Sequence, residues 1–192
     1  MDPVFTLQWP ELVLAERLQS RLPKSQGYSV LVPTSRQEKG IDLAILRKQP
    51  GQKSRVVTIQ VKASRTYMPD PPKRETTKRF KYYTWFNRFE VPETADFFML
   101  FGLYPVEAGR TRSVNSNWYK DCTLVFTYSE MKAFMDSVEK VGGGPDRMFG
   151  FGFDTEQKVV QTRGDPERRE RDLTDRLFET RLPKIREALS EI

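Results

Sequence analysis

The sequence predicts an α/β fold, built as one domain by a chain of 192 residues. Three observations support this. A helix with apolar residues along one side begins at Pro10, and two short strands flank a Pro-Gly turn between residues 41 and 62. A capping box formed by Thr127 and Glu130 then opens a second helix. Helices that are separated along the chain by apolar strands predict a sheet covered by helices.

The first predicted element is a helix of about three turns, because proline is favoured at the first position of a helix. One side of this helix carries an acid among apolar residues: Leu7, Glu11, Leu14, Ala15, Leu18 and Leu22. Glu11 either points into a site at the edge of the sheet or stabilises the positive end of the helix. Glu16 lies on the far side of the helix and is the less favoured alternative for such a site.

Three strands are predicted before residue 65, and the last two form a hairpin: 27–33, 41–46 and 56–62. Residues two apart on a strand share a face, so Gln60 and Lys62 project together. If the two strands of the hairpin pair, Asp42 lies beside them. The sequence therefore predicts a carboxylate, an amide oxygen and an ammonium group on one face of the hairpin.

Later segments complete the predicted sheet. Residues 94–103 are the most apolar segment and predict a central buried strand. Half of the aromatic residues Tyr82, Trp85, Phe86 and Phe89 are expected in the core. The remaining predicted elements are strands at 80–91 and 122–126, a helix at 128–141, a strand at a sheet edge at 147–153, and two short helices separated at Pro183.

Residues 1–164 are expected to form the α/β domain, and residues 165–192 a charged helical extension of the same domain. The extension either caps the domain or pairs with a second subunit. No segment reaches the roughly 18 apolar residues that a membrane helix needs, and no signal peptide is recognised. We therefore expect no membrane association.

The chain has no histidine and a single cysteine, Cys122. This composition excludes an internal disulfide, zinc sites built on histidine, and catalysis by a histidine base. A single cysteine is typical of the reducing cytoplasm, which is the expected location. Hydrolytic chemistry in this chain must therefore depend on carboxylates, lysine or a bound cation.

The net charge of +6 predicts an anionic partner. Residues 65–88 include seven basic residues and only two acids, and aromatic residues lie among the basic ones. Basic residues can bind phosphates and aromatic rings can stack on exposed bases. The predicted nucleic-acid contacts are Arg65, Lys73, Arg74, Lys78, Arg79 and Lys81.

The hairpin residues suit a cation together with a phosphate. Mg²⁺ or Mn²⁺ prefers oxygen ligands and is usually held by one or two carboxylates with waters and substrate oxygens. Asp42 would be the anionic ligand, Gln60 a neutral one and the carbonyl of Val61 a third, with Glu11 as a further acid. Lys62 would orient the attacking water or stabilise charge on the phosphorus.

At Asp42, Gln60 and Lys62, with Ser64 following, the chain resembles the PD-(D/E)xK nuclease superfamily. The resemblance covers about residues 8–65. It implies a restriction-endonuclease-like fold, in which a mixed central sheet is flanked by helices and a hairpin after the first helix carries the site. Most members have an acid where this chain has Gln60, so the chain corresponds to a QxK variant with one anionic ligand fewer.

The resemblance implies a metal-dependent endonuclease that hydrolyses DNA, with RNA as an alternative substrate. Cutting both strands of a duplex takes two sites, so a homodimer or higher homo-oligomer is expected. The alternative is a nucleic-acid-binding or interaction module of the same fold, in which Gln60 marks an inactive site. Binding of DNA by that module would depend on salt but not on a cation.

Overall fold

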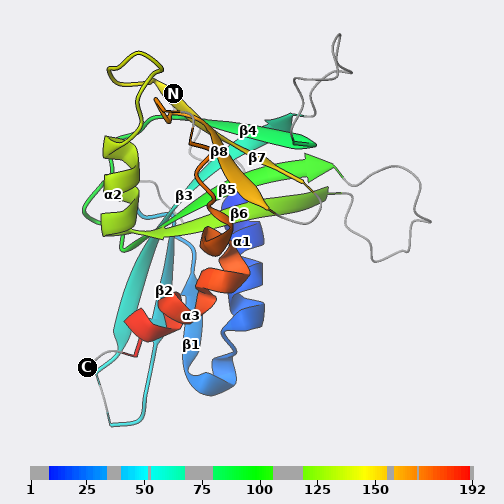
Figure 1. Cartoon of the computed structure of the whole chain (residues 1–192). Coiled ribbons are helices and arrows are strands. Elements are labelled where there is room, and N and C mark those ends of the chain that lie inside the picture. Colours follow the sequence, from blue (N-terminus) through cyan, green and yellow to red (C-terminus); the bar gives the residue numbers. More distant parts are fainter. Residues whose placement is uncertain are drawn as a thin grey trace, which may run out of the picture.

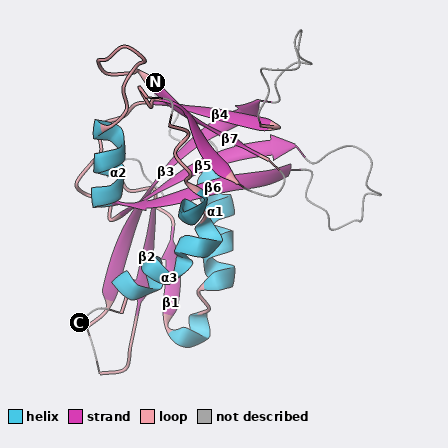
Figure 2. Ribbon diagram, in the orientation of Figure 1, coloured by secondary structure: helices cyan, strands magenta, loops and turns pink. Residues whose placement is uncertain are grey.

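A computed structural model of the chain describes residues 9–33, 40–51, 53–67, 80–105, 119–154, 158–167 and 169–190 (Figure 1). Within these residues the fold contains three α-helices and eight strands (Figure 2). The helices are α1 (Trp9–Arg21), α2 (Tyr128–Asp136) and α3 (Phe178–Ala188). The strands are β1 (Tyr28–Leu31), β2 (Leu43–Arg47), β3 (Arg55–Tyr67), β4 (Tyr82–Asn87), β5 (Phe97–Pro105), β6 (Tyr119–Thr127), β7 (Met148–Phe153) and β8 (Val159–Arg163). The predicted α/β class is confirmed.

The strands form one mixed sheet in which most pairs are antiparallel. Its order is β1-β2-β3-β4-β7-β8, and β5 pairs with β3 and with β6. The β3–β5 pair is parallel and the other pairs are antiparallel. β3 pairs with β2 through Ile59 and with β4 from Thr66 onwards. It therefore belongs to two layers, one formed by β1, β2, β3, β5 and β6, and the other by β4, β7 and β8 with the end of β3.

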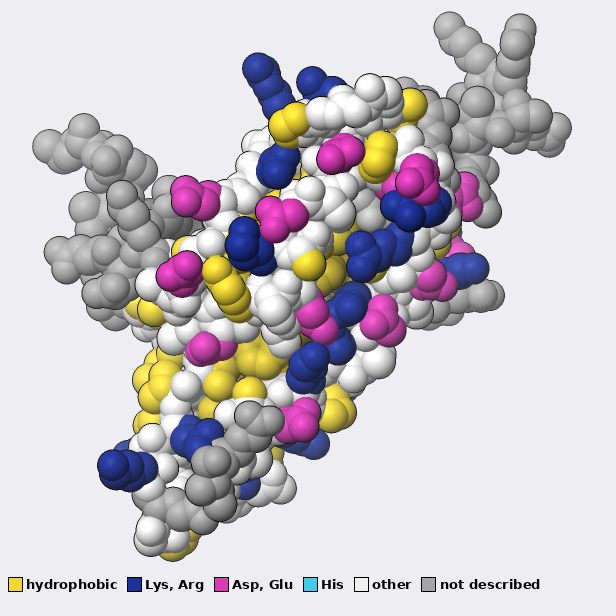
Figure 3. Space-filling model, turned by 60° about the vertical axis from the view of Figure 1, so that its left-hand side comes forward, with side chains coloured by type: hydrophobic (Ala, Val, Ile, Leu, Met, Phe, Trp, Pro, Cys, Tyr) yellow, Lys and Arg dark blue, Asp and Glu magenta, His cyan; other side chains and the backbone are white. Residues whose placement is uncertain are grey.

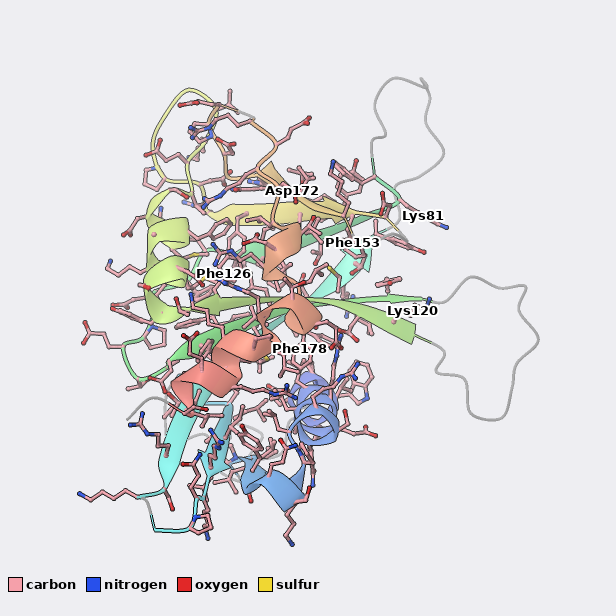
Figure 4. The ribbon with its side chains drawn as sticks, turned by 60° about the horizontal axis from the view of Figure 1, so that its bottom comes forward. Lys81, Lys120, Phe126, Phe153, Asp172 and Phe178 are labelled. Atoms are coloured by element: carbon pink, nitrogen blue, oxygen red, sulfur yellow. The ribbon has the colours of Figure 1, made fainter. Side chains whose placement is uncertain are left out.

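Alternation along the strands separates two cores. The helix-side core lies between the first layer and the helices α1 and α3, and includes Ile59, Val61, Phe101 and Phe178. The inter-layer core lies between the two layers and against α2, and includes Phe98, Leu100, Phe126 and Phe153. Figure 4 labels Phe178 on α3, Phe126 on β6 and Phe153 on β7. Since successive strand residues face opposite sides, Gln60 and Lys62 share the face of the inter-layer core.

The strand predicted at 147–153 was expected at a sheet edge, and this expectation is wrong. β7 lies between β4 and β8, and Phe149, Phe151 and Phe153 are buried. The alternating glycines leave room on the other face: a Cβ at Gly150 would lie 2.4 Å from Trp85, and one at Gly152 would lie 2.4 Å from Phe80. The short β8, which covers the far side of β7, was not predicted from the sequence.

The prediction of two C-terminal helices separated at Pro183 is also wrong, because α3 is continuous through this residue. A proline inside a helix removes one hydrogen bond and costs about 3 kcal/mol. Here Pro183 is exposed, whereas its neighbours Leu182 and Ile185 are buried in the helix-side core. Burial of these side chains offsets the lost hydrogen bond. Local sequence rules for proline do not include this tertiary burial.

Candidate functional site

The hairpin of β2 and β3 holds Asp42 directly before β2. Leu43 pairs with Ile59, and the same register places Asp42 opposite Gln60. The backbone N–H of Asp42 donates to the carbonyl of Ile59 at 2.9 Å. Its carboxylate Oδ2 accepts a hydrogen bond from the N–H of Val61 at 2.7 Å. These two bonds fix the half-buried Asp42 carboxylate against β3.

Gln60 is a polar residue that is buried within the described part of the chain. Its side chain is only 7 % exposed, and within the described residues its Oε1 atom accepts no hydrogen bond. Leaving a buried acceptor unsatisfied costs about 1–3 kcal/mol. A bound cation or water at this position would remove that cost. Gln60 therefore directs an unsatisfied oxygen to the face on which Asp42 also lies.

Lys62 lies two residues further along the same face of β3. Its Nζ is 5.2 Å from the centroid of the Phe89 ring, a distance typical of a cation–π contact. Phe89 is itself stacked on Phe98, with 6.2 Å between ring centroids. The ammonium group is therefore held at the margin of the inter-layer core, half-buried beside solvent. The contact of Phe89 with Lys62 was not predicted, because nothing in the local sequence links Phe89 to a lysine 27 residues earlier.

Val61 presents its backbone to the same edge of β3. The N–H and C=O of one strand residue point to the same side, so the carbonyl of Val61 points towards Asp42, as its N–H does. The pairing of β2 with β3 ends at Leu43 and Ile59, two residues before Val61. The carbonyl of Val61 is thus directed to the same edge of β3 as the Asp42 carboxylate, and its role as a third oxygen ligand stays a prediction.

Glu11 approaches β3 from the other side. α1 packs against the face that carries Ile59 and Val61, whereas Gln60 and Lys62 point to the opposite face. Glu11 is half-buried and its Oε2 atom is buried, while Glu16 is exposed. The hairpin thus brings Asp42, Gln60 and Lys62 to one face, and Glu11 lies on the helix across the strand. A role for Glu11 in cation binding stays a prediction.

The oxygen donors can be compared with what a cation needs. Within the described residues, no group of three or more His, Cys, Asp or Glu side chains could hold a metal. The hairpin offers one carboxylate, one amide oxygen and one carbonyl. All three are hard oxygen donors, which suits Mg²⁺ or Mn²⁺ with waters and phosphate oxygens completing the shell. The donor set fits such a cation, with a lower charge than a two-acid site would have.

The basic residues predicted to contact nucleic acid can be placed only in part. Arg65 and Lys81 are exposed, and Figure 4 shows Lys81 and Lys120 at one end of the molecule. Lys73, Arg74, Lys78 and Arg79 lie outside the described residues. On the face shown in Figure 3, Lys and Arg side chains are interspersed with Asp and Glu. That face carries no large area of a single charge.

Two further residues with reactive or charged side chains, Cys122 and Asp96, have structural roles. Burial raises the pKa of Cys122 to about 12, and the neighbouring Asp121 adds to this effect. A buried neutral thiol is a poor nucleophile. Asp96, at the start of β5, accepts hydrogen bonds from the N–H and hydroxyl of Thr58 at 2.7 and 2.8 Å. Its carboxylate therefore links β3 to the start of β5.

Comparison of the chain with protein-family models, with curated proteins and with solved structures found no match. No helix within the described residues has the length and apolar composition that crossing a membrane requires. The functional interpretation therefore depends on the geometry of the hairpin.

Proposed function

We propose that the protein is a metal-dependent endonuclease that hydrolyses phosphodiester bonds in DNA, with RNA as the alternative substrate. The observation that supports this most directly is the unsatisfied oxygen of Gln60, buried opposite Asp42 and two residues from Lys62. Buried acceptors are nearly always paired, so an unpaired one beside a carboxylate favours a cation ligand. The order of helix, strand and hairpin also agrees with the superfamily that the sequence resembles.

Each side chain then has a separate role. Mg²⁺ or Mn²⁺, when bound, would polarise the phosphoryl group and neutralise charge that builds on its oxygens. Asp42 would supply the anionic ligand, and Gln60 and the carbonyl of Val61 the neutral ones. Lys62 would orient the water whose oxygen attacks the phosphorus in line with the bond to the 3′ oxygen, and would stabilise the developing negative charge. That bond breaks, the water gives its proton to solvent and the 3′ oxygen takes one from solvent, which leaves a 5′-phosphate and a 3′-hydroxyl. Gln60 carries no charge and cannot accept the proton of that water, so it serves as a ligand only.

The test is nicking of supercoiled plasmid by purified protein with Mg²⁺ and with EDTA. We expect cation-dependent activity that falls by at least about a hundredfold in Asp42→Asn and in Lys62→Met. Lys158→Met is the matched control, because Lys158 is exposed and lies far along the chain from the hairpin. Activity that survives both hairpin substitutions would point to a contaminating nuclease and would refute the proposal.

One observation favours a second function, a nucleic-acid-binding module without hydrolysis. The hairpin has a single carboxylate, and a cation held by one acid binds weakly. Titration calorimetry with Mn²⁺ separates the two functions. An endonuclease requires a saturable Mn²⁺ site that Asp42→Asn removes. The binding module requires DNA binding that weakens as the salt concentration rises and does not depend on the cation.

Cleavage of both strands would need two copies of the hairpin, so we also propose a homodimer or higher homo-oligomer on DNA. Sedimentation of the protein with and without a short duplex tests this. A monomeric protein that only nicks one strand at a time would contradict the oligomer and leave the nuclease proposal intact.

A further inference from the structure

The ammonium group of Lys62 is held by an aromatic ring and not by an acid. Its Nζ lies over the Phe89 ring, 5.2 Å from the centroid. Within the described residues Lys62 forms no ion pair, and the Asp42 carboxylate accepts from the N–H of Val61 instead. A carboxylate partner would hold the ammonium group and also neutralise it. A ring attracts it through the negative face of its π-system and leaves the positive charge in place.

Phe89 is itself fixed by both layers of the fold. Its ring is stacked on Phe98 of β5, with 6.2 Å between centroids, and tilted against Phe149 of β7 at 6.4 Å. Phe98 is buried and is the register partner of Gln60 on β3. The ring therefore has a defined position relative to the strand that carries both Gln60 and Lys62.

A lysine side chain needs such a support if its ammonium group is to act in a reaction. Lysine carries its charge on a flexible four-carbon stem, and a group that orients a reactant must be held in a narrow range of positions. Phe89 and Lys62 are both half-buried. Their contact thus restricts the ammonium group without enclosing it.

We propose that Phe89 is a positioning residue for Lys62. Its ring holds the charged ammonium group on the face that Gln60 shares, in the orientation that the attacking water requires. The inference rests on the proposed endonuclease and adds to its site a residue from outside the hairpin. Because Phe89 acts through Lys62 and not on the DNA, its removal should lower kcat and leave KM unchanged.

The first measurement tests the contact without any substrate. In the full chain labelled with ¹³C at the Cε atoms of lysine, Lys62→Met identifies the signal of Lys62 by its loss. The ring current of Phe89 should displace this signal upfield. Phe89→Leu should return it to the position of an exposed lysine such as Lys158.

The second measurement tests the role through kcat and KM for plasmid cleavage with Mg²⁺. Phe89→Leu should lower kcat about tenfold. Phe89→Tyr keeps a ring and should keep kcat, because Phe89 lines a cavity of about 710 Å³ that has room for a hydroxyl. In the Lys62→Met background, Phe89→Leu should have no further effect on the residual cleavage, since the ring acts through the lysine.

Phe86→Leu is the matched control, because Phe86 stacks on Phe149 in the same inter-layer core, with 5.5 Å between centroids. It should lower the melting temperature and leave kcat unchanged. The proposal would be overturned by an undisplaced Lys62 signal, or by an equal loss of kcat in Phe89→Leu and in either Phe89→Tyr or Phe86→Leu. The same loss from Phe89→Leu with and without Lys62 would also overturn it.

The two measurements separate this inference from the proposed function. Absence of cation-dependent cleavage by the unmodified chain would refute the endonuclease and the positioning role with it, even where the Lys62 signal is displaced. Cleavage that depends on Lys62 but not on Phe89 would leave the endonuclease in place and overturn the positioning role alone.

Discussion

At the scale of single residues, Gln60 is the position that decides how strongly the hairpin holds a cation. Its amide oxygen carries no charge, and the only acid that the register places opposite it is Asp42. These residues carry the resemblance to PD-(D/E)xK nucleases, and the register of β2 and β3 brings Asp42 opposite Gln60. Replacing the Gln60 amide by a carboxylate would change the charge of the site but hardly change its shape.

We therefore predict that Gln60→Glu is less stable than the unmodified chain in EDTA, by about 1–3 kcal/mol, because two carboxylates then share a partly buried site. Adding Mg²⁺ or Mn²⁺ should recover this loss and raise the melting temperature more than it does for the unmodified chain. Thermal unfolding with and without the cation measures both effects.

Gln161→Glu is the matched control, because Gln161 is also a buried glutamine, 4 % exposed, but lies on β8. It should lose stability without recovery on adding the cation. Equal recovery in the two variants would mean that the cation does not bind at the hairpin.

At the scale of elements, Glu130 joins α2 to the C-terminal segment. Its Oε1 is 2.6 Å from Arg176 and 3.1 Å from Lys184, and it also contacts Arg181 on α3. Its other oxygen accepts the N–H of Thr127 at 2.9 Å, which completes the predicted capping box. Burial acts to raise the pKa of Glu130, but the hydrogen bonds from Thr127, Arg181, Arg176 and Lys184 outweigh it and hold the pKa well below its ordinary range.

Because the folded pKa of Glu130 is lowered, its contribution to stability is present above the unfolded pKa of about 4.3 and is lost as the pH falls towards the folded value. We predict that Glu130→Gln lowers the free energy of unfolding by about 1–3 kcal/mol at pH 7 and by less at acid pH. Urea unfolding across this pH range measures the difference. Asp136→Asn, which breaks an exposed pair with Lys132, should cost under about 1 kcal/mol, and an equal cost for both would contradict the interpretation.

The elements also show where sequence reasoning works. The hairpin and the capping box were predicted because their signals are local: alternating apolar residues around a turn, and Thr127 three residues before Glu130. The placement of β7 and the continuity of α3 were not, because both depend on packing between distant segments. The contact of Lys62 with Phe89 also depends on packing between distant segments. The pairing that places Asp42 opposite Gln60, in contrast, follows from the hairpin itself.

At the scale of the whole molecule, the C-terminal segment is part of the packing of the first layer. α1 and α3 lie together over that layer (Figure 1), and Arg17 and Arg21 of α1 pair with Glu179 of α3. The segment buries apolar residues in the helix-side core: Phe178, Leu182, Ile185 and Leu189.

We predict that removing residues 165–192 prevents cooperative folding. Burying four such side chains is worth about 6–12 kcal/mol, which is comparable with the whole stability of a domain of this size. Circular dichroism and thermal unfolding should show no cooperative transition. Removal of residues 191–192 alone is the control and should leave the transition in place; a cooperative transition in the longer deletion would show that the segment is dispensable.

The double membership of β3 in the two layers has a consequence for any attempt to redesign this protein. Its odd-numbered side chains from Val57 to Val61 are buried in the helix-side core, and on the opposite face Gln60 is buried and Lys62 contacts the Phe89 ring. Between residues 57 and 62 the strand therefore has no exposed side chain, and a shift of its register by one residue would exchange the residues on its two faces. New ligand groups are best introduced on β2, where only Leu43 and Ile45, on one face, are buried.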